Sequence, residues 1–229
     1  MRRFLAAFAA IATIALAAGC GGSVDDPEST GPQDGFPVTV DDVTLDRRPQ
    51  RIVSLSPTLT EMLFAIDAGS QVVAVDEYST YPDDAPRTDL SGYTPNAEAV
   101  VTYQPDLVVL DTDANGIVAA LRELGVPVYV GPSASTVDDT YRQITELGQL
   151  TGHRAEAEAL VSRMKDDLAK ILAEVPERAE PLTYFYELDN TYYTVTSATF
   201  IGTLFTAAGL VNIADEGNPD NPYPQLSEE

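Results

Sequence analysis

Four short runs of apolar and β-branched residues recur in the first half of the chain, and each is followed by a segment with helical spacing. The runs read RIVSLS, QVVAV, DLVVL and PVYVG, at residues 51–56, 71–75, 106–110 and 127–131. Nearly continuous apolar runs of this length are typical of strands that are covered on both faces. Strands of this kind that alternate with helices predict a doubly wound parallel sheet, so the expected fold class is α/β.

The segments between these runs carry the start signals of helices. In the first of them, Thr58–Glu61 reads as a capping box, with Pro57 tolerated in the first turn. Further helices are expected over about residues 96–102 and 116–124. Ahead of the first run, residues 37–45 read as two short strands joined by a turn. Together these segments predict an N-terminal lobe over residues 38–150.

A long helix is predicted after this lobe. Residues 135–175 carry two helical patterns separated by Leu150-Thr151-Gly152, and the second runs from about Arg154 to Val175. At 1.5 Å per residue its length is roughly 30 Å, which is enough to cross from one domain to another. We therefore expect a linking helix within residues 151–176.

The remaining segment, residues 177–229, reads as the start of a second α/β unit. Strands are expected over 182–189 and 191–196, and a helix over about 200–208. A unit of on the order of 50 residues would be marginal alone. The predicted architecture is therefore two doubly wound lobes joined by one long α-helix, with a second lobe that is truncated.

The N-terminus has the pattern of an export signal. Two arginines precede an apolar run that is short for a membrane span, and small residues then lead to Cys20, the only cysteine. Residues 1–19 are therefore expected to be a signal peptide, and Ala17–Cys20 resembles the lipobox of bacterial lipoproteins. Cys20 would then carry a lipid anchor, with plain secretion as the alternative. Residues 20–37 are rich in Gly, Pro, Ser and Asp and predict a flexible tether.

The charge of the chain excludes two classes of partner. There are 36 acidic against 13 basic residues, a formal net charge of −23. Nucleic acids and anionic lipid headgroups are repelled by such a surface. We therefore expect contact with the membrane through a lipid anchor only, and we take the acidity to keep an extracytoplasmic protein soluble.

Enzyme chemistry and resident metals are not expected. The chain has no G-x-S-x-G, no G-x-G-x-x-G and no phosphate-binding loop, and its single histidine, His153, is expected at the surface. Glu187 and Asp189 lie two residues apart at a predicted strand end, and nothing marks them as a catalytic pair. A metal site for zinc or manganese would need several His and carboxylate ligands. We predict no cofactor and no catalytic residue; a hydrolase on a doubly wound sheet is the disfavoured alternative.

Five stretches carry a resemblance to a known family. The chain resembles the solute-binding lipoproteins of ABC importers in the helical-backbone class, which bind cobalamin, ferric siderophores and haem. The likeness covers Pro37 to the last residue, and RIVSLSPTLTEMLFAIDAG and YQPDLVVL are its most specific parts. The other matching stretches are VVAVDEYSTYP, LRELGVPVYV, and SATFIGTLFTAAGLVNIAD with YPQLSEE.

This resemblance implies a fold, a function and partners. The ligand, a large chelate or corrinoid, would lie in a cleft between two lobes and be delivered to a permease and its ATPase by a monomeric binding protein. Docking to the permease would use one acidic residue on each lobe, at Asp113 and Glu229; glutamate is usual near Asn115, which leaves the first contact open. Relatives continue past YPQLSEE with a further PDLIV-like segment, which agrees with a truncated second lobe.

Candidate ligand-binding residues are those that follow predicted strands. Ser56, Pro57 and Thr58 form a helix N-terminus whose free N–H groups suit an anionic or carbonyl group, with simple helix capping as the alternative. Aromatic side chains after the other strands suit a large planar ligand. Arg87 is the one arginine near such a loop and would serve an anionic ligand. The other candidates are Tyr78, Tyr81 and Tyr93 in the first lobe and Tyr186, Glu187, Tyr193, Phe200 and Tyr223 in the second.

The sequence leaves the identity of the ligand open. Cobalamin-binding relatives have an aromatic residue before the Pro-Gln that matches Pro224-Gln225, so Tyr223 is the best carried-over position. They often use tryptophan at such positions, and this chain has none. Corrinoid, ferric siderophore and haem all remain candidates, as does a surface receptor or sensor that binds such a ligand without transport.

Overall fold

The computed structural model of the protein describes residues 35–216 and 220–227. Cys20, Glu229, the predicted signal peptide and most of the tether lie outside the described residues. The described chain opens with a β-hairpin of β1 (Val38–Val40) and β2 (Val43–Leu45), as the sequence predicted. In both strands the outer residues are buried and the middle one is exposed, so the hairpin packs one face on the core.

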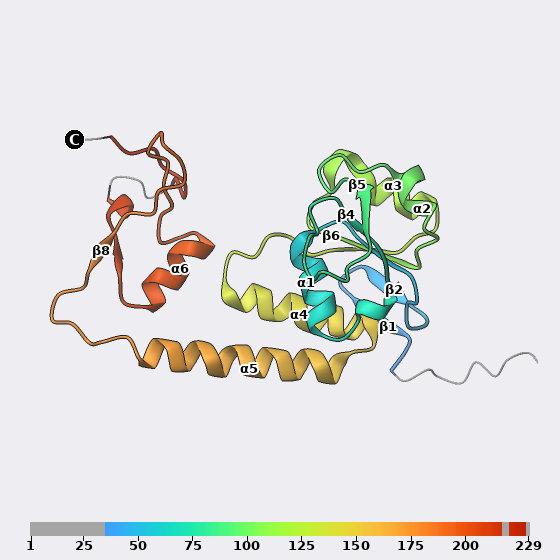
Figure 1. Ribbon diagram of the computed structural model, residues 1–229, viewed down its shortest axis with the longest axis horizontal. Coiled ribbons are helices and arrows are strands. Elements are labelled where there is room, and N and C mark those ends of the chain that lie inside the picture. The colour runs from blue at the N-terminus through green and yellow to red at the C-terminus, as the bar shows by residue number, and fades with distance from the viewer. Residues whose placement is uncertain (1–34, 217–219, 228–229) are drawn as a thin grey trace, which may run out of the picture. The chain divides into compact units, whose positions relative to one another are not determined.

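A five-stranded, all-parallel sheet forms the centre of the N-terminal lobe (Figure 1). Its strand order is β5-β4-β3-β6-β7. The four strands predicted from apolar runs are all present and nearly fully buried, which confirms the α/β class. The strands are β3 (Ile52–Ser54), β4 (Val72–Asp76), β5 (Arg87–Leu90), β6 (Leu107–Leu110) and β7 (Val128–Val130).

Strand β5 was not predicted from the sequence. It reads RTDL, and only Leu90 is buried. The strand lies at an edge of the sheet and pairs with β4 alone, through an irregular register that sets Val75 opposite Arg87. An edge strand of this composition lacks the apolar run that marks a strand covered on both faces.

Helices cover both faces of the sheet, which gives two separate hydrophobic cores. One core joins the sheet to α1 (Pro57–Ala65), α4 (Val137–Thr151) and the β1–β2 hairpin. The other joins it to α2 (Ala97–Val101) and α3 (Ile117–Glu123). In Figure 1, α2 and α3 lie together on one side of the strands, and α1 and α4 lie on the other. Short 3-10 turns, Gly69–Gln71 and Ala114–Gly116, precede β4 and α3.

The start of α1 differs from the prediction. Its N-cap residue is Ser56, and Pro57 takes the first helical position, so the expected capping box at Thr58–Glu61 is wrong. The fixed φ of proline fits the first position, where its missing N–H costs no hydrogen bond. This places Thr58 within the helix rather than before it.

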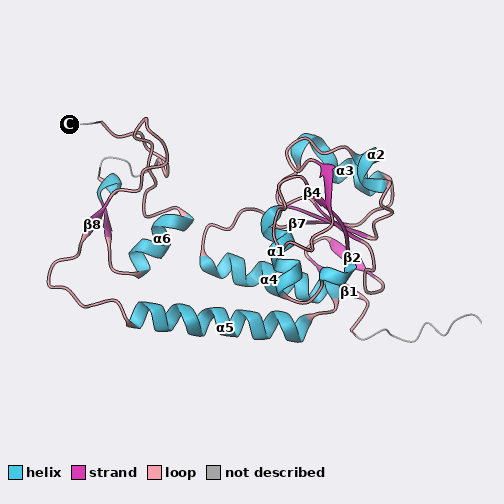
Figure 2. Ribbon diagram, viewed as in Figure 1, coloured by secondary structure: helices cyan, strands magenta, loops and turns pink. Residues whose placement is uncertain are grey.

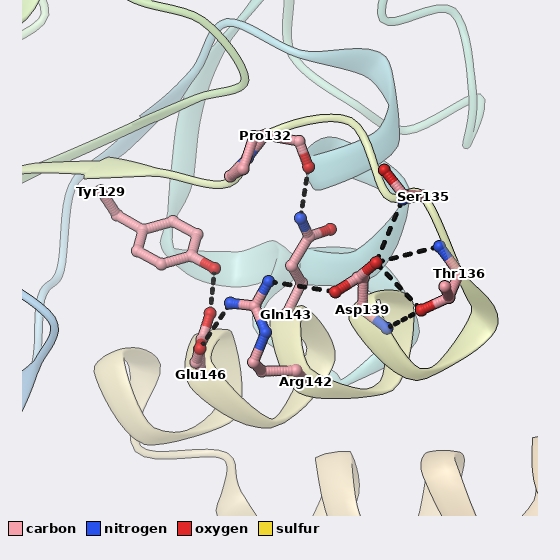
Figure 3. A network of polar contacts seen from close by, with 8 residues as sticks. All are labelled: Tyr129, Pro132, Ser135, Thr136, Asp139, Arg142, Gln143 and Glu146. Carbon is pink, nitrogen blue, oxygen red and sulfur yellow. Dashed lines mark hydrogen bonds and ion pairs between the residues drawn. The ribbon is translucent and has the colours of Figure 1, made fainter. Parts of the chain in front are cut away.

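A polar network joins the start of α4 to β7 (Figure 3). Thr136 and Asp139 form a capping box, and Arg142 links Asp139 (3.6 Å) to Glu146 (2.9 Å). The Tyr129 hydroxyl, on β7, donates to Glu146 at 2.5 Å. Burial and the neighbouring Glu146 carboxylate raise the pKa of Tyr129, so this hydroxyl keeps its proton as a donor.

The predicted long helix is present as α5 (Arg154–Ala173), 20 residues. Helix α4 ends at Thr151 and is capped by Gly152, which has a φ of +75°, and α5 then packs against α4. The two helices approach most closely at Gly148, where a Cβ atom would lie 2.4 Å from the Cβ of Ala157. The two helical patterns read from the sequence are therefore confirmed.

The C-terminal segment contains less strand than the sequence predicted (Figure 2). Strand β8 covers Thr183–Tyr184 and pairs in parallel with β9 (Val211–Asn212); between them lies α6 (Phe200–Ala207), which confirms the expected helix. The predicted strand over 191–196 is wrong. The alternating residues TYYTVT instead form a loop. Its backbone makes hydrogen bonds with residues 222–226 and one isolated β-bridge, between Tyr193 and Gln225. The lobe boundaries remain a prediction.

Candidate ligand-binding site

The sheet topology directs attention to the carboxyl ends of β3 and β6. The chain passes from β3 outward through β4 and β5, and then returns to the other side of β3 to form β6 and β7. Ligands of doubly wound sheets bind outside the strand ends at such a switch point. Ser56–Thr58 follow β3 after one residue, Leu55, and Asp111 directly follows β6.

Ser56 has an unusual environment for an N-cap residue. It is fully buried, yet its side chain makes no cap hydrogen bond, and its Oγ has no partner among the described residues. Simple capping by the Ser56 hydroxyl therefore does not account for this residue. Pro57 is half-buried and Thr58 is exposed. The first turn of α1 therefore presents its backbone N–H groups and the Thr58 hydroxyl at the carboxyl ends of the strands.

Two of the predicted tyrosines are brought together at this edge. Tyr78 follows β4 and Tyr93 follows β5, and their rings meet edge to face with centroids 5.4 Å apart. Both are exposed, Tyr78 to 54% and Tyr93 to 74%. Tyr81, in the same loop as Tyr78, is also exposed. Large exposed rings supported by one another form a contact surface that loses little freedom on binding.

Beneath the two rings lies a buried polar cluster that the sequence prediction missed. Asp76, the last residue of β4, accepts the Ser79 N–H at 2.8 Å. The Ser79 hydroxyl in turn bonds Thr60 of α1 at 3.0 Å, and Thr60 donates to Ser54 of β3 at 2.8 Å. The signal in the sequence is an aspartate at the end of an apolar strand, since aspartate side chains commonly accept from the backbone N–H groups of the turn that follows them.

Arg87 makes two contacts within its own loop. Its guanidinium donates to the carbonyl oxygen of Thr80 and lies 3.8 Å from the Asp83 carboxylate. The bond to Thr80 closes the segment between Thr80 and Arg87, which carries Tyr81. These contacts give Arg87 a structural role in this loop, and its predicted contact with an anionic ligand stays a prediction.

Asp113 is exposed and has a role in the fold. Its carboxylate accepts the Val118 N–H at 2.9 Å, in the first turn of α3. Asn115 beside it has a φ of 59°, a left-handed conformation that asparagine tolerates. Both side chains are exposed, so the predicted docking contact at Asp113 remains a prediction.

The candidates in the C-terminal segment fall into two groups. Tyr186 packs its ring 6.0 Å from Phe205 of α6, beside a stacked Tyr184–Phe205 pair. Tyr193 and Tyr223 are both exposed, and the backbone bonds between their segments hold them near each other. Glu187 is exposed, and Phe200 begins α6 half-buried.

His153 is not at the surface as the sequence predicted. It precedes α5, its side chain is 12% exposed, and Arg48 donates to its Nε2 at 2.5 Å. Gln71 lies 3.1 Å from the same nitrogen. The prediction failed because Arg48 is 105 positions away in the chain, and the residues around His153 give no sign of the Arg48–His153 contact.

Metal-binding clusters and membrane-spanning helices are both absent from the described residues. Residues 35–216 and 220–227 hold no group of three or more His, Cys, Asp or Glu side chains arranged to bind a metal ion. Within the same ranges, no helix has the length and apolar character needed to cross a bilayer.

Comparison with known proteins places these features in a family. Residues 52–229 match the family model described as "Periplasmic binding protein". The chain belongs to the periplasmic binding protein family. The members of this family are binding proteins rather than enzymes, which agrees with the function class predicted from the sequence.

The relatives extend the comparison. A "Cobalamin-binding protein" of Halobacterium salinarum is 38% identical over 206 residues, which cover 85% of this chain and 55% of that protein. An uncharacterized ABC transporter substrate-binding lipoprotein of Bacillus subtilis is 32% identical, with coverage of 86% and 68%. Thus the chain spans about half the length of the Halobacterium relative.

A solved structure shows the same fold. A possible iron-binding (periplasmic solute-binding) protein from Staphylococcus epidermidis superposes with a TM-score of 0.70 at 25% sequence identity. The match covers 80% of this chain and 72% of that one. The names of the Halobacterium and Staphylococcus proteins thus refer to two kinds of ligand, a corrinoid and iron.

Proposed function

We propose that this chain is the extracytoplasmic binding component of an ABC importer and that it captures a cobalamin-type corrinoid. The observation that carries the proposal is the exposed Tyr78–Tyr93 pair, which stands at the carboxyl edge of the sheet beside the open N-terminus of α1. Aromatic rings next to unpaired backbone N–H groups suit a large ligand with a flat face and peripheral amide carbonyls. The 38% identical cobalamin-binding relative supports the same ligand class.

Charge favours a corrinoid over an anionic siderophore or haem. Asp76, Asp111 and Asp113 lie at or just beyond the ends of β4 and β6. Arg87, the arginine predicted for an anionic ligand, bonds Thr80 through one Nη and lies 3.8 Å from the Asp83 carboxylate. A propionate or catecholate group at this edge would meet these carboxylates, and the charge of Arg87 is already partly offset by Asp83.

The partners follow from the same proposal. Cys20 would carry the lipid anchor, and a permease with its ATPase would receive the ligand, with Asp113 and Glu229 as docking residues. We infer a monomeric binding protein, and we assign Tyr186, Glu187, Tyr193, Phe200 and Tyr223 to ligand contact in the C-terminal segment. The 32% identical lipoprotein, which is described as an ABC transporter substrate-binding protein, supports the transport role.

The proposal is tested by titration of the purified chain with cyanocobalamin, haem and a ferric catecholate siderophore, followed by tyrosine fluorescence. We expect cyanocobalamin to bind with a Kd below about 10 μM and more tightly than the two anionic ligands. Tyr93→Ala should weaken cyanocobalamin binding by about tenfold, since it removes one half of the ring pair.

Leu124→Ala is a matched control, because Leu124 is 56% exposed and follows α3, away from the strand ends. It should leave the affinity unchanged. A chain that bound none of the three ligands below that concentration would refute the proposal. Equal binding by Tyr93→Ala and the wild type would show that the tyrosine pair is not the contact surface. Uptake of the ligand by cells distinguishes an importer from a receptor. A chain that binds the ligand in vitro but supports no uptake in cells would be a receptor that only senses the ligand.

A further inference from the structure

Asp76 lies directly beneath the candidate site and has no assigned role. It is the last residue of β4, and only 2% of its surface is exposed. A carboxylate is seldom buried to this extent without a specific partner, because burial disfavours the charged form. Its contacts run to each of the two loops that carry the exposed tyrosines.

The first contact shapes the loop after β4. The Asp76 carboxylate accepts the Ser79 N–H at 2.8 Å, and the Asp76 carbonyl accepts the same N–H at 3.3 Å. This closes a turn in which Tyr78 occupies an exposed position. Without the side-chain acceptor, the Ser79 N–H would be buried with a single long hydrogen bond.

The second contact fixes the loop after β5. Gly92 packs so closely that a Cβ atom there would lie 2.7 Å from Asp76 Oδ2 and 2.6 Å from the Leu55 carbonyl oxygen. Only glycine fits this position, and Tyr93 is the next residue along the chain. The carboxylate of Asp76 therefore packs against the loop after β5 that carries Tyr93.

A third connection links the turn after β4 to α1 and β3. Ser79 bonds Thr60 at 3.0 Å, and Thr60 bonds Ser54 at 2.8 Å. All three hydroxyls are buried. The turn that Asp76 closes is thus tied to α1 and β3, on either side of Ser56.

We propose that Asp76 is a positioning residue for ligand binding, whose buried carboxylate holds the turn of Tyr78 against the loop of Tyr93 and so presets the ring pair. The part of this inference that concerns ligand binding rests on the proposed function. The part that concerns the pairing of the Tyr78 and Tyr93 rings rests on the geometry alone. Rings that are already paired before the ligand arrives lose less conformational freedom when it binds.

The role requires a hydrogen-bond acceptor rather than a charge. Burial raises the pKa of the Asp76 carboxyl, hydrogen bonds from Ser79 and Tyr78 offset part of this, and the Asp111 carboxylate adds to the rise. Asparagine offers the same acceptor oxygen without the charge. The asparagine variant therefore separates positioning from electrostatics.

The experiment compares Asp76→Ala with Asp76→Asn in the full chain, with two readouts. The first is the NOE between the Tyr78 and Tyr93 rings without ligand, and the second is the Kd for cyanocobalamin. Asp76→Ala should lose the NOE and weaken binding by about tenfold, as expected when a preset contact surface is lost. Asp76→Asn should keep the NOE, bind within about threefold of the wild type, and melt at or above its temperature at neutral pH.

Two controls guard against a general loss of stability. Ile144→Val lowers stability through the core around α4, on the opposite face of the sheet from α2, and should change neither readout. Asp89→Asn removes an exposed carboxylate from β5 and should also be silent. An intact NOE in Asp76→Ala, or an equal loss in Asp76→Asn and Asp76→Ala, would overturn the inference. If the wild type does not bind cyanocobalamin, the proposed function fails, and the NOE still decides the positioning role.

Discussion

The residue His153 joins three parts of the chain that are far apart in sequence. Arg48 donates to its Nε2, so this nitrogen is an acceptor and the ring is neutral. Gln71 beside it donates to the carbonyl oxygens of Pro49 and Thr151. The neutral ring thus holds the segment before β3 against the corner between α4 and α5.

This contact makes stability depend on pH in a defined direction. Burial and the Arg48 charge lower the pKa of His153, and the Glu156 and Asp67 carboxylates offset part of this. Because the unfolded chain binds the proton more tightly, the free energy of unfolding should fall as pH drops below about 6.5 toward the lower folded pKa. His153→Gln keeps a neutral acceptor and should show less of this fall.

Urea denaturation of both chains between about pH 7 and pH 5 measures the effect, since the chain has no other histidine to titrate there. Acidic residues titrate mostly below this range and change both chains alike. Parallel pH dependence in the two chains would show that the Arg48–His153 contact does not set the stability.

At the scale of elements, the close approach of α4 and α5 depends on one glycine. A Cβ atom at Gly148 would lie 2.4 Å from the Ala157 Cβ and 3.0 Å from the His153 carbonyl oxygen. In an exposed helix, alanine in place of glycine stabilises by about 1 kcal/mol. Here the collision should reverse the sign, and Gly148→Ala should destabilise by about 1–3 kcal/mol.

Urea denaturation reads out this difference, and Glu158→Ala is the control because Glu158 lies exposed on α5. The control should be neutral within about 0.5 kcal/mol. A gain in stability for Gly148→Ala would mean that the helices separate at this point without loss.

The elements that the sequence predicted well are those with both faces buried. Strands β3, β4, β6 and β7 were found because their apolar runs need no knowledge of their neighbours. The polar edge strand β5 was missed, and TYYTVT was read as a strand because alternation alone does not say whether a partner strand exists.

The candidate site was predictable to a similar extent. Strand order places the residues after β3 and β4 at one edge, so Ser56 and Tyr78 were selected from topology and residue type, and Tyr93 was selected as a tyrosine after the Ser91-Gly92 turn. Asp76 and Gly92 were not, because their importance lies in a contact between two loops that sequence spacing does not reveal. The hydrogen bond from Arg87 to Thr80 was not predicted, because it depends on the register of β5, and ligand contact by Arg87 stays a prediction.

At the scale of the whole molecule, the charge of −23 acts against compactness. Ion pairs among the described residues are few and largely exposed, such as Arg122–Asp42 and Lys170–Asp167, so they offset little of the repulsion. Salt screens charges that are separated by more than about 10 Å at 0.1 M. The melting temperature should therefore rise by a few degrees as NaCl is raised from about 10 to 200 mM.

Sucrose at equal osmolality controls for effects of the solute other than screening. NaCl and KCl should act alike, because the described residues hold no cluster that would select one cation. A melting temperature that did not change with salt would show that the acidic residues are too far apart to repel one another.

The polar composition of β5 has a consequence for how this protein behaves at high concentration. A sheet edge exposes unpaired backbone groups onto which a strand of another molecule can add. On β5 the exposed Arg87 and Asp89 side chains oppose such addition, and at the other edge Arg122 donates to the Val128 carbonyl oxygen of the three-residue strand β7. Both edges of the five-stranded sheet thus resist β-aggregation, so the chain should stay dispersed at concentrations at which a longer, apolar edge strand would associate.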